Sequence, residues 1–221
     1  MEHPAGPSAP GARAVAERLR GPLAELGLGL SEASAERLAR YLGLLLPWNQ
    51  RVNLTGAQSA DEILDRHLAD TFALLPYLLP GPLRLVDVGA GAGFLGVGVA
   101  ALRPDAHCVL LEPIGKKHAF LRAVARELPL ANLEARAERL DAHLARSDFT
   151  PFDVAVSRAT WPPLEWLDCA GALLRPGGLA VAYEGREPVA LPSGVTRASY
   201  RVGRRAGALL LRIRRGEGDE V

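Results

Sequence analysis

Apolar residues recur at helical spacing near the start of the chain. From Glu32 to Leu46 they fall three and four residues apart, which predicts one helix with a single apolar stripe, ending before Pro47. A similar pattern from about Ala14 to Leu26 predicts an earlier helix. The Pro- and Gly-rich stretch before it, about 12 residues long, is expected to be flexible. The chain therefore begins with helices rather than strands.

A third helix is expected after the segment WNQRVNLTG. Ser59 and Glu62 have the spacing of a capping box, in which the two side chains bind backbone N–H groups, and the helix that they open would run toward Leu75. Residues 1–80 are thus predicted to form an N-terminal helical extension. Residues 81–221 are predicted to form a separate domain, because their hydrophobic pattern is different.

From residue 81 onward, short apolar runs alternate with helical periodicity, which is typical of βαβ units and a parallel sheet. The expected strands are Leu85–Val88, Cys108–Glu112, Leu133–Ala135, Val154–Ser157 and Leu179–Tyr183. The expected helices between them are Gly93–Leu102, Gly115–Glu127, Leu140–Arg146 and Leu164–Leu174. Two further segments, Val195–Val202 and Ala206–Ile213, would pair as an antiparallel hairpin at one sheet edge, before a solvated tail, GEGDEV. The pattern predicts an α/β fold.

Composition restricts the class of protein more than its function. The 221 residues are 48% hydrophobic and 23% charged, enough for one substantial core, and a net charge of +1 gives no overall field that attracts nucleic acid. Cys108 and Cys169 lie in apolar runs without metal-ligand spacing, so free buried thiols and no metal are expected. No apolar run is long enough for a bilayer and the start lacks a signal-peptide core, which favours a cytoplasmic protein without membrane contact. We expect a monomer.

The stretch RLVDVGAGAGFLG places a glycine-rich turn between an expected strand and an expected helix, where backbone N–H groups can approach a ligand closely. Gly91, Gly93 and Gly96 match the dinucleotide pattern G-x-G-x-x-G. Glu112 follows at the distance where an acid binds ribose hydroxyls. Gly89, Gly91 and Gly93 match a tighter G-x-G-x-G pattern equally well. A third interpretation is structural, with the glycines allowing close helix–strand packing.

Asp87, at the end of the first expected strand, helps to choose among these ligands. A carboxylate repels a pyrophosphate in a partly dry cleft, whereas it attracts the ammonium and sulfonium of S-adenosylmethionine. In the structural alternative, Asp87 caps the following helix. Asp87, Glu112 and Arg158 lie at or just after the ends of three expected strands, so they would converge where open α/β sheets bind ligands.

The order of strands, with one ending in SRA and the next following a Pro-Gly-Gly turn, resembles the Rossmann-like class I methyltransferase fold. That fold has a mostly parallel seven-stranded sheet that ends with a reversed strand. Six segments carry a more specific resemblance: WNQRVNLTG, RHLADTFAL, VDVGAGAGFLG, LLEPIGKKHAFLRAV, ARAE and SRA. In this order they resemble the bacterial glucose-inhibited division protein B family, from about Gly27 to Gly185. The resemblance implies an S-adenosylmethionine-dependent methyltransferase that modifies N7 of a guanine in small-subunit (16S) ribosomal RNA, free or in an assembling particle.

The resemblance also implies residues that bind the cofactor. Gly89 and Phe94 would border it, Glu112 would face its ribose, and the ARAE segment would lie beside its adenine. Together with the carboxylate and the turn glycines, the expected set is Asp87, Gly89, Gly91, Gly93, Phe94, Glu112, Ala137, Glu138 and Arg158. The alternative for Glu138 is charge complementarity with a helix N-terminus.

A second set would contact RNA. It comprises Arg136, Arg66, His67, Lys116 and Lys117, as a local phosphate-contacting surface. Arg158 would orient the base. The alternatives are a surface salt bridge for Arg158, an i,i+4 pair with Asp70 for Arg66, and a structural role for His67. Trp48 would fix the helical extension against the sheet or stack on a base.

The sequence departs from the family pattern in three places. The turn continues as GFLG where the family has a GLPG-like segment, and Lys117 stands where arginine is common. Glu184 follows the fifth strand where the family commonly has a lysine, so a charge reversal would face phosphates and weaken RNA binding.

Guanine N7 offers a lone pair and no proton, so methyl transfer needs orientation and exclusion of water rather than a general base. No catalytic acid or base is therefore expected. Three other functions stay open: a methyltransferase of the same fold acting on a small molecule or protein, a non-catalytic cofactor-binding module associated with the ribosome, and a nicotinamide-dependent oxidoreductase.

Overall fold

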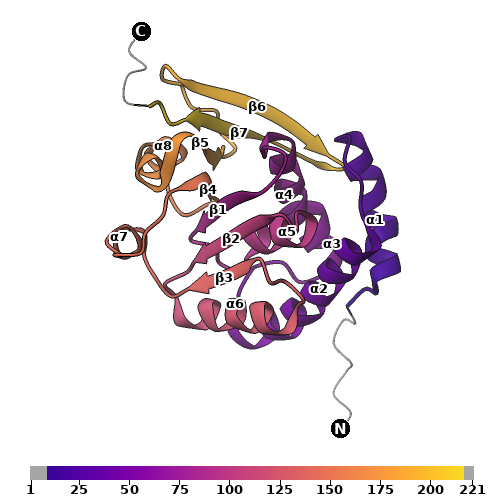
Figure 1. The fold of residues 1–221 in the computed structure, drawn as a ribbon. Helices are drawn as coiled ribbons and strands as arrows, with labels where there is room; N and C mark the ends of the chain where they lie inside the picture. Colours follow the sequence, from indigo (N-terminus) through magenta and orange to yellow (C-terminus); the bar gives the residue numbers. More distant parts are fainter. Residues whose placement is uncertain (1–8, 217–221) are drawn as a thin grey trace.

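Within residues 9–216, which the computed structural model describes, seven strands form one sheet with the order β3-β2-β1-β4-β5-β7-β6 (Figure 1). The strands are β1 (Leu83–Val88), β2 (Ala106–Leu111), β3 (Leu133–Arg136), β4 (Phe152–Ser157), β5 (Leu174–Tyr183), β6 (Val195–Val202) and β7 (Arg205–Ile213). β7 is antiparallel to β5 and β6, and the other neighbouring strands are parallel. The predicted mostly parallel sheet with a C-terminal hairpin is confirmed.

Helices cover both faces of the sheet, because successive strand side chains alternate between two buried faces. The helical elements are α1 (Ala12–Glu25), α2 (Glu32–Val52), α3 (Ala60–Glu62), the π-helical turn η1 (Ile63–Leu68), α4 (Ala69–Leu74), η2 (Leu75–Tyr77), α5 (Phe94–Leu102), α6 (Gly115–Glu127), α7 (Leu140–Leu144), α8 (Pro163–Ala170) and η3 (Gly171–Leu173). Leu85 of β1 packs in one core with α1–α6, and Val86 packs in a second core with α7 and α8. Figure 1 shows the same two layers on either side of the sheet.

The α5 helix packs closely on β2 at Gly96. A Cβ atom on Gly96 would lie 2.5 Å from Leu110 Cδ1 of β2, so a larger residue would force the Leu110 side chain or the helix to move. Gly96 also donates its N–H to the Asp87 carboxylate, at 2.9 Å. The third glycine of the G-x-G-x-x-G pattern therefore serves helix–strand packing and holds Asp87.

The helix that was expected to end at Leu46 instead runs through Pro47 to Val52. A proline removes one helical hydrogen bond, but the turn beyond it is fixed by other contacts. The Trp48 ring packs on Phe120 of α6, with ring centroids 5.6 Å apart. The Asn49 side-chain amide donates to the carbonyl of Ala57 and accepts from the N–H of Thr55. These contacts stabilise the turn after Pro47. Trp48 packs on α6 rather than directly on the sheet, and its stacking on a base stays a prediction.

The helices of residues 9–80 share one hydrophobic core with the sheet, since Leu38 and Leu68 belong to the same buried cluster as Leu85. The division into two domains at residue 80 stays a prediction.

The expected flexibility of the first residues falls largely on residues 1–8, and the solvated tail on residues 217–221; both lie outside the described residues. Among residues 9–216, no helix has the length and apolar character needed to span a bilayer.

Candidate functional site

Three cavities adjoin one another at the carboxyl ends of the central strands. The glycine-turn cavity has a volume of about 250 Å³ and is lined by Asp87, Gly89, Gly91, Phe94, His67 and Arg158, among others. The β3 cavity, about 580 Å³, is lined by Val88, Pro113, Glu138, Leu140 and Trp161, among others. The hairpin cavity, about 390 Å³, is lined by His67, Asp70, Arg158, Trp161, Tyr183 and Arg205, among others. Because residues 158–161 contribute to all three, that segment lies between them.

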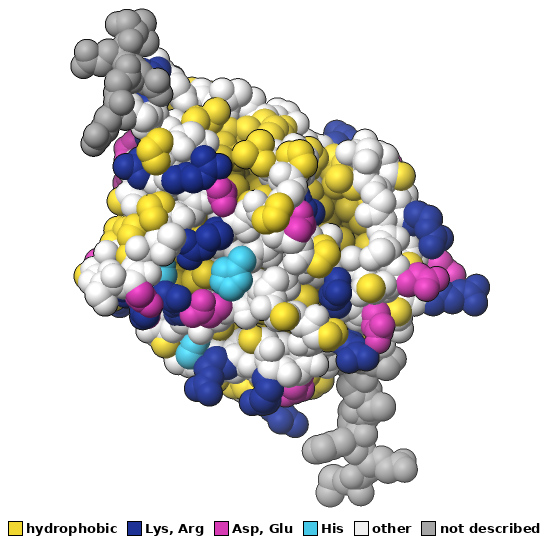
Figure 2. All heavy atoms as spheres, viewed as in Figure 1, with side chains coloured by type: hydrophobic (Ala, Val, Ile, Leu, Met, Phe, Trp, Pro, Cys, Tyr) yellow, Lys and Arg dark blue, Asp and Glu magenta, His cyan; other side chains and the backbone are white. Residues whose placement is uncertain are grey.

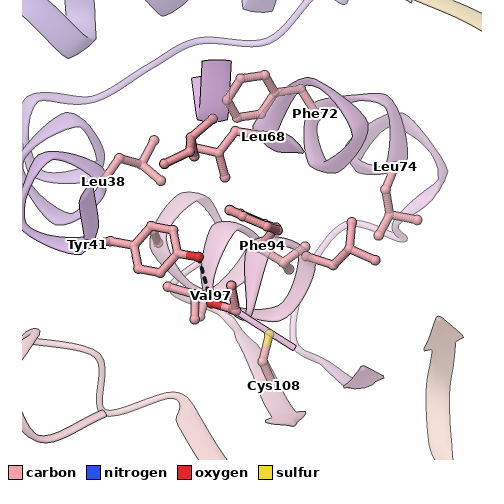
Figure 3. Close-up of a cluster of buried hydrophobic side chains, with 14 of the residues drawn as sticks. Leu38, Tyr41, Leu68, Phe72, Leu74, Phe94, Val97 and Cys108 are labelled. Carbon is pink, nitrogen blue, oxygen red and sulfur yellow. Dashed lines mark hydrogen bonds between the residues drawn. The ribbon is translucent and has the colours of Figure 1, made fainter. Parts of the chain in front are cut away.

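The glycine turn adopts a conformation that favours glycine. Gly89 has a φ of 74°, and a Cβ atom there would clash with the side chain of Thr160. The turn is also held from the N-terminal helices, because the Tyr41 hydroxyl donates to the carbonyl of Ala92 at 2.7 Å (Figure 3). The Thr71 hydroxyl donates to the carbonyl of Phe94 at 2.8 Å. Two helices that precede the sheet thus fix the turn by its backbone.

Two carboxylates lie beside this turn, as the sequence predicted. Asp87 is 2% exposed, and burial raises its pKa to about 7, although the Gly96 N–H and the positive charge of Arg158 lower it. The Glu112 carboxylate accepts from the N–H of Gly91 at 2.7 Å and from the N–H of Ile114 at 2.9 Å. Both side chains are therefore held by backbone donors. A cation beside Asp87 would stabilise its ionised form.

Arg158 is held by a buried carboxylate rather than by a surface acid. Its Nη1 donates to Asp70 Oδ2 at 2.8 Å, and the Asp70 side chain is 3% exposed. Asp70 also accepts from Tyr200 and Arg205 of the hairpin, at 2.6 and 2.7 Å. The Tyr183 hydroxyl donates to the Asp70 backbone carbonyl at 2.9 Å. We call Asp70, Arg158, Tyr183, Tyr200 and Arg205 the Asp70 cluster.

His67 joins the Asp70 cluster to the glycine turn. Its ring stacks on Phe94, with centroids 4.2 Å apart and planes 5° apart, and Arg158 Cζ lies 5.4 Å from the centroid of the same Phe94 ring. Arg158 Nη2 lies 3.0 Å from His67 Nδ1. Burial first, and then the positive Arg158, lower the pKa of His67 to about 4, so the ring is neutral near pH 7.

Of the remaining predicted cofactor residues, Glu138 lies at the β3 cavity, whereas Ala137 and Gly93 do not line it. The Glu138 carboxylate is bound by His143 at 3.0 Å and Arg146 at 2.7 Å. Glu138 also directly precedes the N-cap residue of α7, Arg139, so its interpretation as a charge that complements a helix N-terminus stays open. Ala137 is exposed in the loop before α7. Gly93 precedes α5 as its N-cap, with a φ of 83°.

The predicted RNA-contacting residues do not form one cluster of unpaired cations. Arg66 pairs with Glu62 at 2.6 Å, not with Asp70, because Asp70 is turned inward to the hairpin and Arg158. Arg136 pairs with Glu134 at 2.7 Å. The others are His67, which is neutral, the exposed Lys116, and the half-buried Lys117, which lines the glycine-turn cavity.

Two further expectations are corrected. Glu184 does not present a bare charge, because its side chain is 5% exposed and accepts from Arg197 at 2.7 and 2.8 Å and from the Val189 N–H at 2.9 Å. Folding of the loop after β5 onto β6 buries it.

Cys108 is a free buried thiol as expected, whereas Cys169 is exposed, because it faces outward from α8 beside the β3 cavity.

Sequence reasoning missed Asp70 as a site residue, together with Thr160, Trp161 and Tyr183. One signal was available for Asp70, since a carboxylate in the apolar run HLADTFALL needs a partner if the run is buried. Its partners could not be read from the chain, because Arg158 is 88 residues away and Arg205 is 135 residues away.

The sheet order and the position of the cleft define a class I methyltransferase architecture. A proposed O-methyltransferase from Klebsiella pneumoniae has a similar structure, with a TM-score of 0.55 at 14% identity, over 93% of this chain and 99% of that chain. A similarity at this level of identity establishes the fold alone.

The particular family follows from the sequence comparisons. The GidB family, described as rRNA small subunit methyltransferase G, matches residues 34–190. Proteins named ribosomal RNA small subunit methyltransferase G from Chromobacterium violaceum and Neisseria gonorrhoeae are both 38% identical to this chain. Each alignment covers 78% of this chain, with 83% and 81% of the respective relative. The chain belongs to the GidB family of rRNA small subunit methyltransferases.

Proposed function

We propose that this protein transfers a methyl group from S-adenosylmethionine to N7 of a guanine in small-subunit ribosomal RNA. One observation carries the proposal beyond family membership. Asp87, Phe94 and Arg158 all line the glycine-turn cavity, Arg158 also lines the hairpin cavity, and Glu112 accepts from the Gly91 N–H of the turn. The Asp87 carboxylate suits a cationic cofactor, and the Arg158 guanidinium suits an aromatic base with acceptor atoms.

The residues present fit S-adenosylmethionine better than a dinucleotide. Asp87 lines the glycine-turn cavity, where it would favour the ammonium and sulfonium charges and disfavour a phosphate. Glu112 would bind ribose hydroxyls, and the cavity beside Glu138 and Leu140 would hold the adenine. When bound there, the cofactor supplies an electrophilic methyl group.

The chain's own contribution is positioning. Guanine N7 has a lone pair and no proton, so the side chains must orient the base and exclude water rather than remove a proton. Arg158 is pre-organised for this task, because Asp70 and His67 fix its guanidinium and Phe94 lies beside it. In this proposal none of these residues acts as a general acid or base.

The charge distribution is compatible with an RNA substrate that contacts only a small area of the protein surface. On the face drawn in Figure 2, Lys and Arg side chains are scattered among Asp and Glu rather than gathered in one field. The ion pair of Glu184 with Arg197 removes the repulsion that a bare carboxylate would have caused. We therefore place the contacts with phosphates near Lys116 and Lys117, and we propose a cytoplasmic monomer that acts on exposed RNA or an assembling particle.

The test is tritiated methyl transfer from S-adenosylmethionine to small-subunit particles, and to their purified RNA, from cells that lack this protein. The modified nucleoside is then identified, and cofactor binding is measured by calorimetry. Label in 7-methylguanosine at one position is the expected result. Label in another nucleoside would contradict the choice of base, whereas binding without transfer to either substrate would favour the non-catalytic module.

A further inference from the structure

His67 faces two of the three cavities at once. It lies in the π-helical turn η1, and its ring lines both the glycine-turn cavity and the hairpin cavity. The parallel stack on Phe94 fixes the plane of the ring. A base that entered the hairpin cavity toward the cofactor side would therefore meet the edge of this imidazole.

The position of the ring proton follows from Arg158. A guanidinium has only donors, so the 3.0 Å contact between Arg158 Nη2 and His67 Nδ1 requires that Nδ1 accept. A neutral imidazole with an accepting Nδ1 carries its proton on Nε2. Among the described residues, none accepts a hydrogen bond from Nε2. His67 thus presents one oriented, unused N–H donor and no positive charge.

A neutral donor is poorly suited to a phosphate, which was the expected partner of His67, but it suits a carbonyl oxygen. Guanine presents its O6 carbonyl next to N7 on the same edge, whereas adenine presents an N6 amino donor at that position. A donor that binds O6 leaves the lone pair of N7 free. The same donor would face the N6 amino group of adenine, which is also a donor, so no hydrogen bond would form.

We propose that the Nε2–H of His67 donates to O6 of the target base and thereby selects guanine over adenine at this site. This proposal rests on the proposed function. It changes the role of His67 from a contact with the RNA backbone to recognition of the base. Arg158 then has a second task, because it fixes the His67 tautomer as well as lying beside the base.

Two substitutions separate this role from a structural one. In His67→Gln, the longer amide can place an N–H near the position of Nε2, and in His67→Asn, the shorter amide oxygen can still accept from Arg158 near the position of Nδ1. If His67 donates to the base, His67→Gln retains more activity than His67→Asn. If His67 only supports Arg158, the order is reversed.

The experiment measures kcat/KM for methyl transfer to unmethylated small-subunit particles, with wild type and both variants. We expect a fall of about 10- to 100-fold for His67→Asn and a smaller fall for His67→Gln. A second set of particles carries adenine at the target position, and there the preference for guanine should weaken in His67→Asn. Calorimetry with S-adenosylmethionine and a thermal melt check that both variants keep the cofactor site and the fold.

The outcomes distinguish the two proposals. If the wild-type protein does not label 7-methylguanosine, the proposed function fails. If wild type does so and His67→Asn is as active as wild type, or is at least as active as His67→Gln, the base-recognition role is overturned. An unchanged preference for guanine in His67→Asn would overturn it equally.

Discussion

The cleft has a glycine-turn side, at the glycine-turn cavity, and a hairpin side, at the hairpin cavity, and the two are built by different means. On the glycine-turn side, Asp87 and Glu112 are held by backbone N–H groups of residues at most 21 positions away. On the hairpin side, Asp70 binds side chains 88, 130 and 135 positions away. The first side needs the glycine turn, the end of β2 and the contacts of α2 and α4 with the turn backbone, but no side chain from the hairpin. The second side exists only when α4, β4 and the β6–β7 hairpin have all assembled.

This difference predicts that the two halves of the site can be damaged separately. Backbone donors remain when a distant side chain is removed, so the cofactor side should survive changes in the hairpin. A buried carboxylate with several cationic or hydroxyl donors, in contrast, leaves uncompensated charges when it is removed.

The largest effect is expected from Asp70→Ala. The change leaves Arg158 and Arg205 without their shared buried partner and should lower the free energy of unfolding by about 3–5 kcal/mol. Asp70→Asn keeps the volume and should lower it less. Urea denaturation measures both, with Glu36→Ala as control, because the exposed Glu36–Arg40 pair should contribute at most about 0.5 kcal/mol.

The effect of Asp70→Asn on function tests whether the two sides of the cleft are independent. Folded Asp70→Asn protein should bind S-adenosylmethionine within about threefold of wild type, a change of less than 1 kcal/mol, while methyl transfer falls about tenfold or more. A loss of cofactor affinity as large as the loss of transfer would show that the two sides are not independent.

A pH dependence of intermediate size is expected on the glycine-turn side. Because the pKa of Asp87 is raised to about 7, a cationic ligand that favours the carboxylate must displace a proton at lower pH. The affinity for S-adenosylmethionine should therefore rise by up to about tenfold per pH unit between pH 5.5 and 7, where the ligand's ammonium stays protonated. Calorimetry over this range measures it.

Asp87→Asn is the matched control for this titration. Its affinity should be lower near pH 7 and almost independent of pH over the same range. Its apo form should also lose less stability than wild type as the pH rises from about 4 to 7, because a raised native pKa makes ionisation of Asp87 unfavourable to the fold. A pH slope that persists in Asp87→Asn would assign the titration to another group.

The same comparison explains what the sequence could predict. The glycine turn, Asp87 and Glu112 were predictable because their roles depend on short spacing at the end of a strand. The alternation of strands and helices and the C-terminal hairpin followed from periodicity in the same way, and the boundaries of α6 agree with the prediction.

The parts that were not predicted depend on tertiary contacts. The inward turn of Asp70, the burial of Glu184 under Arg197 and the continuation of α2 through Pro47 each require a partner from a distant segment. Periodicity gives no information on which distant side chain approaches. An arginine-rich chain offers many equivalent candidates, so the actual ion pairs could not be chosen from the sequence.

The smallest expected effects come from removing one hydroxyl on each side. Tyr41→Phe removes the donor to the Ala92 carbonyl, and Tyr200→Phe removes one of the donors to Asp70 (Figure 3 shows the first contact). Each should cost about 1–2 kcal/mol in the free energy of unfolding, as one lost hydrogen bond does when its partner stays buried.

The two variants should differ in function although the chemical change is the same. Tyr41→Phe loosens the glycine turn and should raise the Kd for S-adenosylmethionine by about three- to tenfold. Tyr200→Phe leaves the turn intact, so it should leave this Kd unchanged and lower methyl transfer instead. Calorimetry and tritium transfer on both variants test this difference. Equal changes in Kd would mean that the glycine turn and the Asp70 cluster are coupled. The coupling would then pass through His67 and Phe94, whose rings are in contact.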